Sequence, residues 1–153
     1  MPLPDPAPAL PCWQAWFDGS ALPNPGRIGI GIVLMAPDGQ RHEQSFVPRE
    51  SGCNNEAELL ALCAALTLAH EAGARRLQVQ GDSNIAVRYV NGQDKTAINR
   101  LLILIQRAQT LLLNFDEVAL SWVPRHRNQA ADALSRRALG LPDKPASARA
   151  RHV

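Results

Sequence analysis

The spacing of apolar and polar residues along the 153-residue chain predicts a mixed α/β domain. The first part contains apolar and β-branched runs separated by turn residues, a pattern typical of strands joined by tight turns. We predict strands at residues 13–17, 28–35 and 41–47. The Pro23-Asn24-Pro25-Gly26 and Pro37-Asp38-Gly39 segments supply the turns between them. The first strand is expected to stop at Asp18-Gly19.

Helices and strands alternate in the rest of the chain. Apolar residues at helical spacing, bounded by Asn, Ser or Gly, predict helices at residues 54–71, 83–90, 97–113 and 128–139. Short apolar runs predict two further strands, at residues 77–80 and 117–123. Asn54 and Asn55 are expected to cap the first of these helices, and Gly140 to end the last. Three strands followed by this alternation predict an α/β fold with a hairpin at one edge of the sheet.

Proline and basic residues divide the chain into three parts. Seven of the twelve prolines lie in the first 25 residues, and five of these precede Cys12. A flexible Pro-rich arm is therefore expected at residues 1–11. A single domain is expected at residues 12–140, and a basic C-terminal tail at residues 141–153.

The composition is that of an ordinary soluble globular protein, with 46% hydrophobic and 20% charged residues. No apolar run is long enough to span a bilayer, and the N-terminus lacks the basic and apolar regions of a secretory signal. The three cysteines have no C-x-x-C spacing, which indicates reduced thiols rather than a disulfide framework or a zinc site. We therefore expect a cytoplasmic protein without a membrane partner.

Positive charge is concentrated toward the C-terminus. The formal net charge is only +2, but from Arg125 onward there are seven basic side chains against two acidic ones, a local charge of +5. Fourteen of the sixteen basic residues are arginines, which bind phosphate through a planar fork. A polyanionic ligand and a merely solvated arginine-rich tail explain this pattern equally well.

Three acidic residues are candidates for a functional site in the first two thirds of the chain. Asp18 and Asp82 each follow a predicted strand, and the carboxyl ends of strands are where α/β sheets bind ligands. In the first helix Glu58 lies on the side of the apolar stripe, whereas Glu56 points roughly away from it. The alternatives are that the aspartates only form turns, and that Glu58 forms a capping box with Asn55.

Asp132, in the first turns of the last helix, is the fourth candidate. On its own it is explained by the helix dipole or by a pair with Arg136. Together the four acids are predicted to meet at one rim of a small sheet, where they would repel one another strongly unless hard cations neutralised them. The sequence therefore predicts a divalent metal site at this rim.

The four acids stand in four motifs: "WFDGSALPNPG", "NNEAELLAL", "GDSNIAV" and "WVPRHRNQAADALSRRA". In order and spacing these motifs resemble those of type 1 ribonucleases H over about residues 13–140, and within that family the short-loop subgroup without a basic protrusion. The resemblance implies a ribonuclease H-like fold. In this fold a five-stranded mixed sheet, an antiparallel three-strand hairpin unit plus two parallel strands, is flanked by helices.

The resemblance also implies an activity, the endonucleolytic cleavage of the RNA strand of RNA–DNA hybrids. Two Mg²⁺ ions, for which Mn²⁺ can substitute, would activate the attacking water and stabilise the leaving oxygen. The implied ligands of these ions are Asp18, Glu58, Asp82 and Asp132.

Three asparagines are implied to contact the minor groove of the hybrid. They are Asn24 in the Pro-Asn-Pro-Gly turn and Asn54 and Asn55 at the start of the first helix. An amide side chain suits a 2′-hydroxyl because it can both donate and accept a hydrogen bond. Turn formation and helix capping are the alternative explanations.

Other side chains are candidates for contacts with phosphate or for proton transfer. Ser83 and Asn84 open a helix, whose free backbone N–H groups can bind a phosphate. Arg125 and Arg127 would supply positive charge. His126, between them, is a candidate for carrying a proton or assisting product release, with a plain surface histidine as the alternative.

Alternative functions stay open beside this interpretation. A 3′–5′ exonuclease of the same superfamily would carry Asp-x-Glu on the first strand, and residues 18–20 are Asp-Gly-Ser, which argues against it. A non-cleaving hybrid- or RNA-binding module with the same fold would have lost a carboxylate. A nuclease that also accepts double-stranded RNA is compatible with every motif. We expect a monomer, although the apolar circumference of helix 97–113 leaves a homodimer through it as an alternative.

Overall fold

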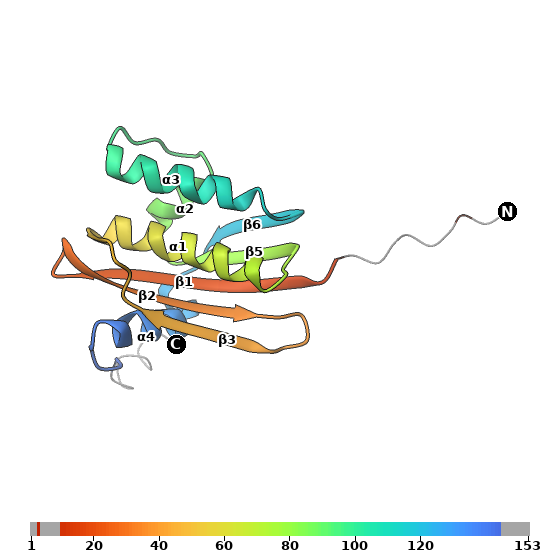
Figure 1. Cartoon of the computed structure of the whole chain (residues 1–153), viewed down its shortest axis with the longest axis horizontal. Coiled ribbons are helices and arrows are strands. Elements are labelled where there is room, and N and C mark those ends of the chain that lie inside the picture. Colours follow the sequence, from red (N-terminus) through yellow and green to blue (C-terminus); the bar gives the residue numbers. More distant parts are fainter. Residues whose placement is uncertain (1–2, 4–9, 145–153) are drawn as a thin grey trace.

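In the computed structural model, which describes residue 3 and residues 10–144, one mixed sheet carries helices on both faces (Figure 1). The elements in chain order are β1 (Cys12–Leu22), β2 (Gly26–Met35), β3 (Arg41–Phe46), β4 (Ser51–Gly52), α1 (Asn54–Glu71), β5 (Arg76–Gly81), α2 (Asn84–Val90), α3 (Asn99–Leu112), β6 (Glu117–Trp122), a 3₁₀ turn (Arg125–Arg127) and α4 (Gln129–Ala138). The predicted Pro-rich arm and basic tail fall largely on residues outside those described.

The sheet has the strand order β3-β2-β1-β5-β6, with β4 paired to β2. The β1–β2 and β2–β3 pairs are antiparallel, and the β1–β5 and β5–β6 pairs are parallel. This confirms the predicted mixed sheet of a hairpin unit plus two parallel strands. Strand β4 was not predicted, because two residues are too few to show a period.

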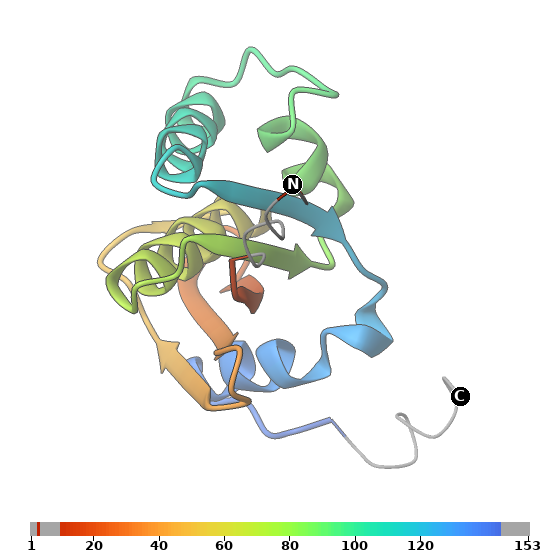
Figure 2. The same cartoon turned by 90° about the vertical axis from the view of Figure 1, so that its right-hand side faces the viewer.

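The helices form layers on the two faces of the sheet. Helix α1 packs on β1, β2 and β5, and α3 packs on α1, while α4 lies on the opposite face against β1, β2 and β3 (Figures 1 and 2). Each parallel crossover from one strand to the next needs a helix, and α1, with α2 and α3, supplies them on one face. Among the described residues, none of the helices combines the length and apolar character needed to cross a bilayer.

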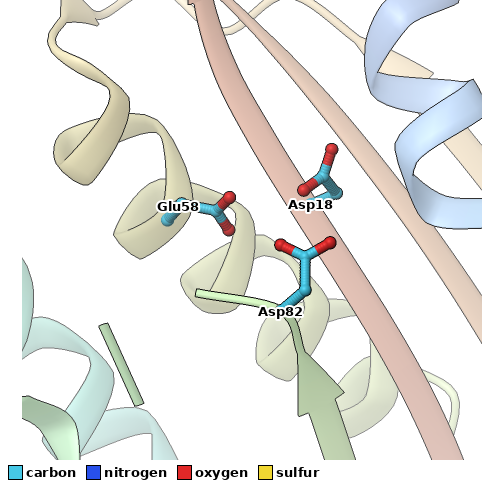
Figure 3. Close-up of side chains that lie close together, drawn as sticks. All are labelled: Asp18, Glu58 and Asp82. Carbon is cyan, nitrogen blue, oxygen red and sulfur yellow. The ribbon is translucent and has the colours of Figure 1, made fainter. Parts of the chain in front are cut away.

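Strand β1 is longer than predicted. It does not stop at Asp18 but continues to Leu22, because residues 18–22 pair with residues 27–31 of β2. Its parallel neighbour β5 ends earlier, at Gly81, which lies beside Phe17 in the register. Asp18 is therefore the first residue of β1 beyond the end of β5, and Asp82 is the residue that follows β5 (Figure 3).

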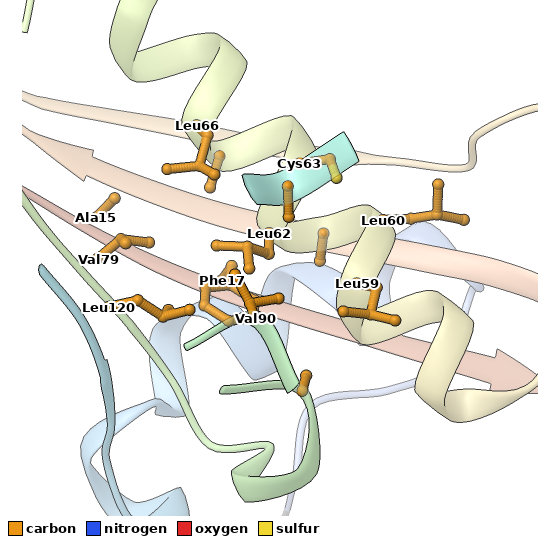
Figure 4. Close-up of a cluster of buried hydrophobic side chains, with 14 of the residues drawn as sticks. Ala15, Phe17, Leu59, Leu60, Leu62, Cys63, Leu66, Val79, Val90 and Leu120 are labelled. Carbon is orange, nitrogen blue, oxygen red and sulfur yellow. The ribbon is translucent and has the colours of Figure 1, made fainter. Parts of the chain in front are cut away.

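A continuous apolar core lies between α1 and the sheet (Figure 4). Phe17 from β1, Leu62 and Leu66 from α1 and Val79 from β5 are fully buried in it. Burying a side chain of this size stabilises the fold by roughly 1.5–3 kcal/mol. The apolar stripe of α1 is wider than predicted, because α3 covers the side of α1 that faces away from the sheet.

The cap of α1 and the start of α3 differ from the prediction, although α1 itself begins at Asn54 as predicted. The N-cap of α1 is Cys53, not Asn54 or Asn55, both of which lie within the helix. Helix α3 begins at Asn99 rather than Ala97, because the Ile98 N–H donates to the Thr96 hydroxyl oxygen (3.1 Å) and leaves Ile98 as the N-cap. Sequence patterns seldom fix helix starts to better than a few residues.

Helix α3 buries only one of its apolar faces. Its buried side chains are Leu101, Leu104, Ile105 and Ala108. Leu102 and Ile103 are 36% and 51% exposed, which agrees with the wide apolar circumference read from the sequence. The homodimer through this helix remains a prediction.

Candidate metal centre

Three carboxylates converge where β5 ends. Asp18 comes from β1, Asp82 follows β5, and Glu58 comes from the second turn of α1. One oxygen atom of each lies within 4.8 Å of the others (Figure 3). Asp18 is buried, with 6% of its surface exposed, and the other two are partly exposed. The structure therefore brings three of the four predicted acids together, a group that we call the carboxylate cluster.

The glycine after Asp18 allows this convergence. A Cβ atom on Gly19 would overlap the backbone carbonyl of Ala57 and come within 2.9 Å of the backbone nitrogen of Glu58. Any side chain at residue 19 would therefore push α1 away from β1. Because glycine has none, the backbone of α1 approaches the strand closely enough for Glu58 to reach Asp18.

The helical phase of α1 separates Glu58 from Glu56, as the sequence predicts. The Glu56 carboxylate accepts a hydrogen bond from the Cys53 backbone N–H (3.2 Å) and pairs with Arg100 (3.2 Å). Glu56 is therefore the acid of the capping box at the start of α1. The alternative in which Glu58 caps the helix with Asn55 is wrong, and the Glu58 carboxylate instead faces Asp18 and Asp82.

Burial determines the electrostatics of the cluster. Desolvation, followed by repulsion from Asp82 and Asp132, raises the pKa of Asp18 to about 8. The pKa of Glu58 is raised well above its ordinary value, first by burial and then by repulsion from Asp18. Burial also raises the pKa of Asp82, although a hydrogen bond from Asn128 partly offsets the effect. Without a cation the cluster therefore retains protons near neutral pH.

One oxygen of the cluster has no partner. Glu58 Oε2 is buried and makes no hydrogen bond to any described residue. A buried acceptor in this condition costs stability unless a ligand meets it. Carboxylate oxygens are the ligands that hard divalent cations such as Mg²⁺, Mn²⁺ and Ca²⁺ prefer. The residues of the cluster therefore fit a divalent cation.

Asn128 holds Asp82 in place, a role that the sequence pattern does not reveal. Its buried amide group donates hydrogen bonds to the Phe17 carbonyl oxygen (2.9 Å) and to Asp82 Oδ2 (3.2 Å). One side chain thus links β1, the end of β5 and the start of α4. Asn128 is the N-cap of α4 by position, but its side chain makes no capping hydrogen bond. The only sequence signal for this role is that Asn128 lies four residues before Asp132. An asparagine at the start of a helix is ordinarily interpreted as its N-cap, and that interpretation hides the contact with Asp82.

Asp132 lies at the same site but outside the carboxylate cluster. It stands in the first turn of α4 with 26% of its side chain exposed, and Lys144 Nζ is 2.9 Å from its Oδ2. Its charge raises the pKa of both Asp18 and Asp82. The pair with Arg136 that the sequence allowed does not form, since the Arg136 guanidinium binds the Pro142 carbonyl instead.

An open cleft of about 770 Å³ contains the four acids. Of the residues predicted to contact substrate, it is lined by Asn54, Asn55, Ser83 and Arg125. Positive side chains from the end of α4 and the residues after it also face the cleft, namely Arg136, Arg137 and Lys144. A cleft with acids at its centre and basic groups on its wall suits a ligand that carries phosphates around a metal site.

Two of the three predicted asparagines accept structural hydrogen bonds from the backbone. Asn24 Oδ1 accepts from the Asn54 backbone N–H (3.0 Å), and Asn54 Oδ1 accepts from the Ala21 backbone N–H (2.9 Å). These bonds tie the turn after β1 to the start of α1. Each bond takes up one of the two lone pairs of an amide oxygen and leaves the NH₂ groups of Asn24 and Asn54 as donors for a ligand.

Four predicted substrate or catalytic residues do not line the cleft, although they stand near it in the chain. They are Asn24, Asn84, His126 and Arg127. His126 is exposed in the 3₁₀ turn between Arg125 and Arg127. Arg127 lies at a smaller pocket on the other side of Asn128, together with Trp16. Their functional roles remain predictions.

Comparisons with known proteins agree with this geometry. A family model described as reverse transcriptase-like matches residues 16–138. The chain is 36% identical over 126 residues to Ribonuclease HI from Halobacterium salinarum, a match that covers 82% of this chain and 63% of that protein. The crystal structure of RNase H1 from the same archaeon has a TM-score of 0.80 at 35% identity, covering 84% of this chain and 98% of that one.

Two further relatives extend the comparison. LC11-RNase H1, solved in complex with an RNA/DNA hybrid, has a TM-score of 0.75 at 28% identity, covering 84% of this chain and 96% of that one. The bifunctional protein Rv2228c from Mycobacterium tuberculosis is 35% identical over 137 residues, which are 86% of this chain. The chain spans only 63% of the Halobacterium protein and 36% of the mycobacterial one.

Replacing Asp18 by Asn is expected to stabilise the metal-free protein, because one of several mutually repelling buried carboxylates is removed. The folded-state pKa of Asp18, about 8, exceeds its unfolded value. The wild type should therefore lose stability as the pH rises from about 4 to about 8, and Asp18→Asn should lose less.

Thermal unfolding in EDTA measures this effect. Near neutral pH the variant should exceed the wild type by about 1 kcal/mol or more, and the gap should narrow at acidic pH or with a saturating divalent cation. A variant that is less stable than the wild type at every pH would mean that Asp18 is a structural residue of the strand.

Proposed function

Because the chain belongs to the ribonuclease H1 family, we propose that it is a metal-dependent endoribonuclease that cleaves the RNA strand of RNA–DNA hybrids. The observation that carries the proposal is the convergence of Asp18, Glu58 and Asp82 in a cleft whose wall is basic. A non-cleaving module of the same fold would not need to bury three like charges together, since their repulsion costs stability without a cation.

The cation in this proposal is Mg²⁺, with Mn²⁺ able to substitute, and two ions are expected. Asp18, Glu58 and Asp82 would hold them together with Asp132, which lines the same cleft from α4. When bound, such ions lower the pKa of a coordinated water and neutralise charge on the scissile phosphate. The carboxylates are preorganised for this task, because Asn128 fixes Asp82 and β2 fixes Asp18 within a strand.

The residues of the cleft wall would bind the hybrid by its shape and charge. The NH₂ groups of Asn24 and Asn54 are held by bonds to their amide oxygens and would donate to 2′-hydroxyl groups. Asn54 and Asn55 line the cleft, whereas Asn24 would donate from outside its lining. A 2′-hydroxyl distinguishes RNA from DNA, so that these contacts would select the strand that is cut.

Phosphate contacts in this proposal come from Arg125 and from the residues that open α2. The Ser83 hydroxyl oxygen accepts from the Ala86 backbone N–H (3.2 Å), which leaves its O–H free to donate to a phosphate. Asn84 and Arg127 would reach phosphates beyond the cleft, and His126 would assist proton transfer or product release from the exposed turn. A cytoplasmic location and a monomeric state complete the proposal.

Cleavage assays on three substrates test the proposed function most simply. The purified protein should cut the RNA strand of a labelled RNA–DNA hybrid in Mg²⁺, and EDTA should stop the reaction. Double-stranded RNA distinguishes a broader nuclease, and single-stranded RNA is the negative control. Cleavage of the DNA strand, or activity that survives EDTA, would contradict the proposal.

Glu58→Gln and Glu56→Gln form a matched pair of variants on one turn of α1. Glu58→Gln should abolish cleavage, because it removes a metal-binding charge from the cluster. Glu56→Gln should retain most of the activity, because Gln can still accept the Cys53 N–H bond of the capping box, and it should lose only the ion pair with Arg100, about 0–1 kcal/mol of stability. Initial cleavage rates measure the activity of both variants, and melting curves measure their stability. Equal or reversed losses of activity would contradict the assignment of the two glutamates.

The basic C-terminus is expected to contribute to substrate affinity rather than to turnover. Truncation after Leu141 should weaken hybrid binding and flatten the slope of log K against log[salt] by roughly one to two units, at about 0.9 per phosphate contact. At saturating substrate and metal, kcat should stay nearly unchanged, because a phosphate contact of the tail acts alike on ground and transition states and saturating metal offsets the loss of the Lys144 ion pair. Unchanged affinity and slope would mean that the residues after Leu141 make no phosphate contact.

A further inference from the structure

Lys144 makes an ion pair in the cleft that the proposed reaction does not use. Its Nζ lies 2.9 Å from Asp132 Oδ2. None of the three acids of the carboxylate cluster has an ion pair with any described residue. The four acids therefore differ in whether a positive side chain of the protein pairs with them. Three face one another and leave an oxygen without a partner, while the fourth is already neutralised by a cation of the protein itself.

Helix α4 holds the segment that carries this lysine. Gly140, with a φ of 73°, reverses the chain at the end of the helix. The Arg136 guanidinium then donates two hydrogen bonds to the Pro142 carbonyl oxygen (3.1 and 2.9 Å). The chain after α4 is thus folded back along the helix toward its first turn, where Asp132 stands. The Gly140 turn and the hydrogen bonds from the Arg136 side chain thus place Lys144 near Asp132 independently of the ion pair.

The ammonium group acts on the metal site at short range. Lys144 lines the same cleft as the carboxylate cluster, and its charge lowers the pKa of Asp82. A divalent cation bound to Asp132 would stand close to this ammonium group and be repelled by it. The ammonium group and the metal therefore compete for one carboxylate.

We propose that Lys144 is an internal counter-ion of Asp132 that competes with the divalent cation. It neutralises Asp132 in the metal-free protein and has to leave before Asp132 can serve as a metal ligand. The inference rests on the proposed function for the identity of the metal site. In this proposal Lys144 determines the cation concentration at which the site fills. The two ligands of Asp132, the ammonium group and the metal ion, each lower the affinity of Asp132 for the other.

Calorimetric titration of the full chain with Mg²⁺ at low salt tests this role without an activity assay. Lys144→Gln removes the charge and keeps most of the length of the side chain. The matched control is Lys95→Gln, which changes the only other lysine in the chain, an exposed one outside the cleft. Lys144→Gln should bind Mg²⁺ about two- to fivefold more tightly than the wild type, as the release of a partly exposed ion pair predicts, and Lys95→Gln should not differ. Unchanged or weaker binding by Lys144→Gln would overturn the proposal.

The same titration in an Asp132→Asn background shows whether Lys144 acts through this carboxylate. There Lys144→Gln should no longer change Mg²⁺ affinity, since no charged partner remains to be released. An equal effect in both backgrounds would mean that the lysine only adds to the general charge of the cleft, which overturns the counter-ion role. A wild type that binds no divalent cation would overturn the proposed function as well, whereas normal binding that Lys144 does not affect would overturn this inference alone.

Discussion

The register between β1 and β5 is the constraint on which the site depends. Since β5 ends beside Phe17 while β1 continues along β2, Asp18 stands inside a strand with no neighbour on one side. Asp82, the residue after β5, fills the space beside it. A shift of one residue in the parallel pairing would turn Asp18 to the other face or move Asp82 away from it. The apolar core under α1 fixes this register, because Phe17 and Val79 are buried on the same side of the sheet.

Bringing these carboxylates together is electrostatically unfavourable. Carboxylates that are buried together favour their protonated forms, and the raised pKa values of Asp18, Glu58 and Asp82 are the consequence. Hydrogen bonds from neutral donors offset the repulsion and desolvation of these carboxylates only in part. Asn128 donates to Asp82, but one oxygen of Glu58 stays without a partner among the described residues. A divalent cation would satisfy all three groups at once, so that the acids form one site and are not separate polar residues.

Much of this could be predicted from the sequence, for reasons that particular residues make clear. The α/β fold with a hairpin edge follows from periodicity and turn chemistry, the five-stranded mixed sheet follows from the family resemblance, and the helical phase separates Glu58 from Glu56. The end of β1 was predicted wrongly, because Asp18-Gly19 looks like a turn when the pairing with β2 is not known. The cap of α1 was also predicted wrongly, since Asn54 uses its side chain on the Ala21 backbone and Cys53 takes the cap.

Contacts between residues far apart in the chain could not be predicted from local sequence patterns. The bond of Asn128 to Asp82 and the pair of Lys144 with Asp132 depend on how α4 and the chain after it fold back on the sheet. If the carboxylate cluster holds a divalent cation, crystals of the protein soaked in Mn²⁺ and measured at the manganese absorption edge should show an anomalous peak in contact with Asp18, Glu58 and Asp82. Anomalous peaks only at other places, with none at the cluster, would contradict a metal site there.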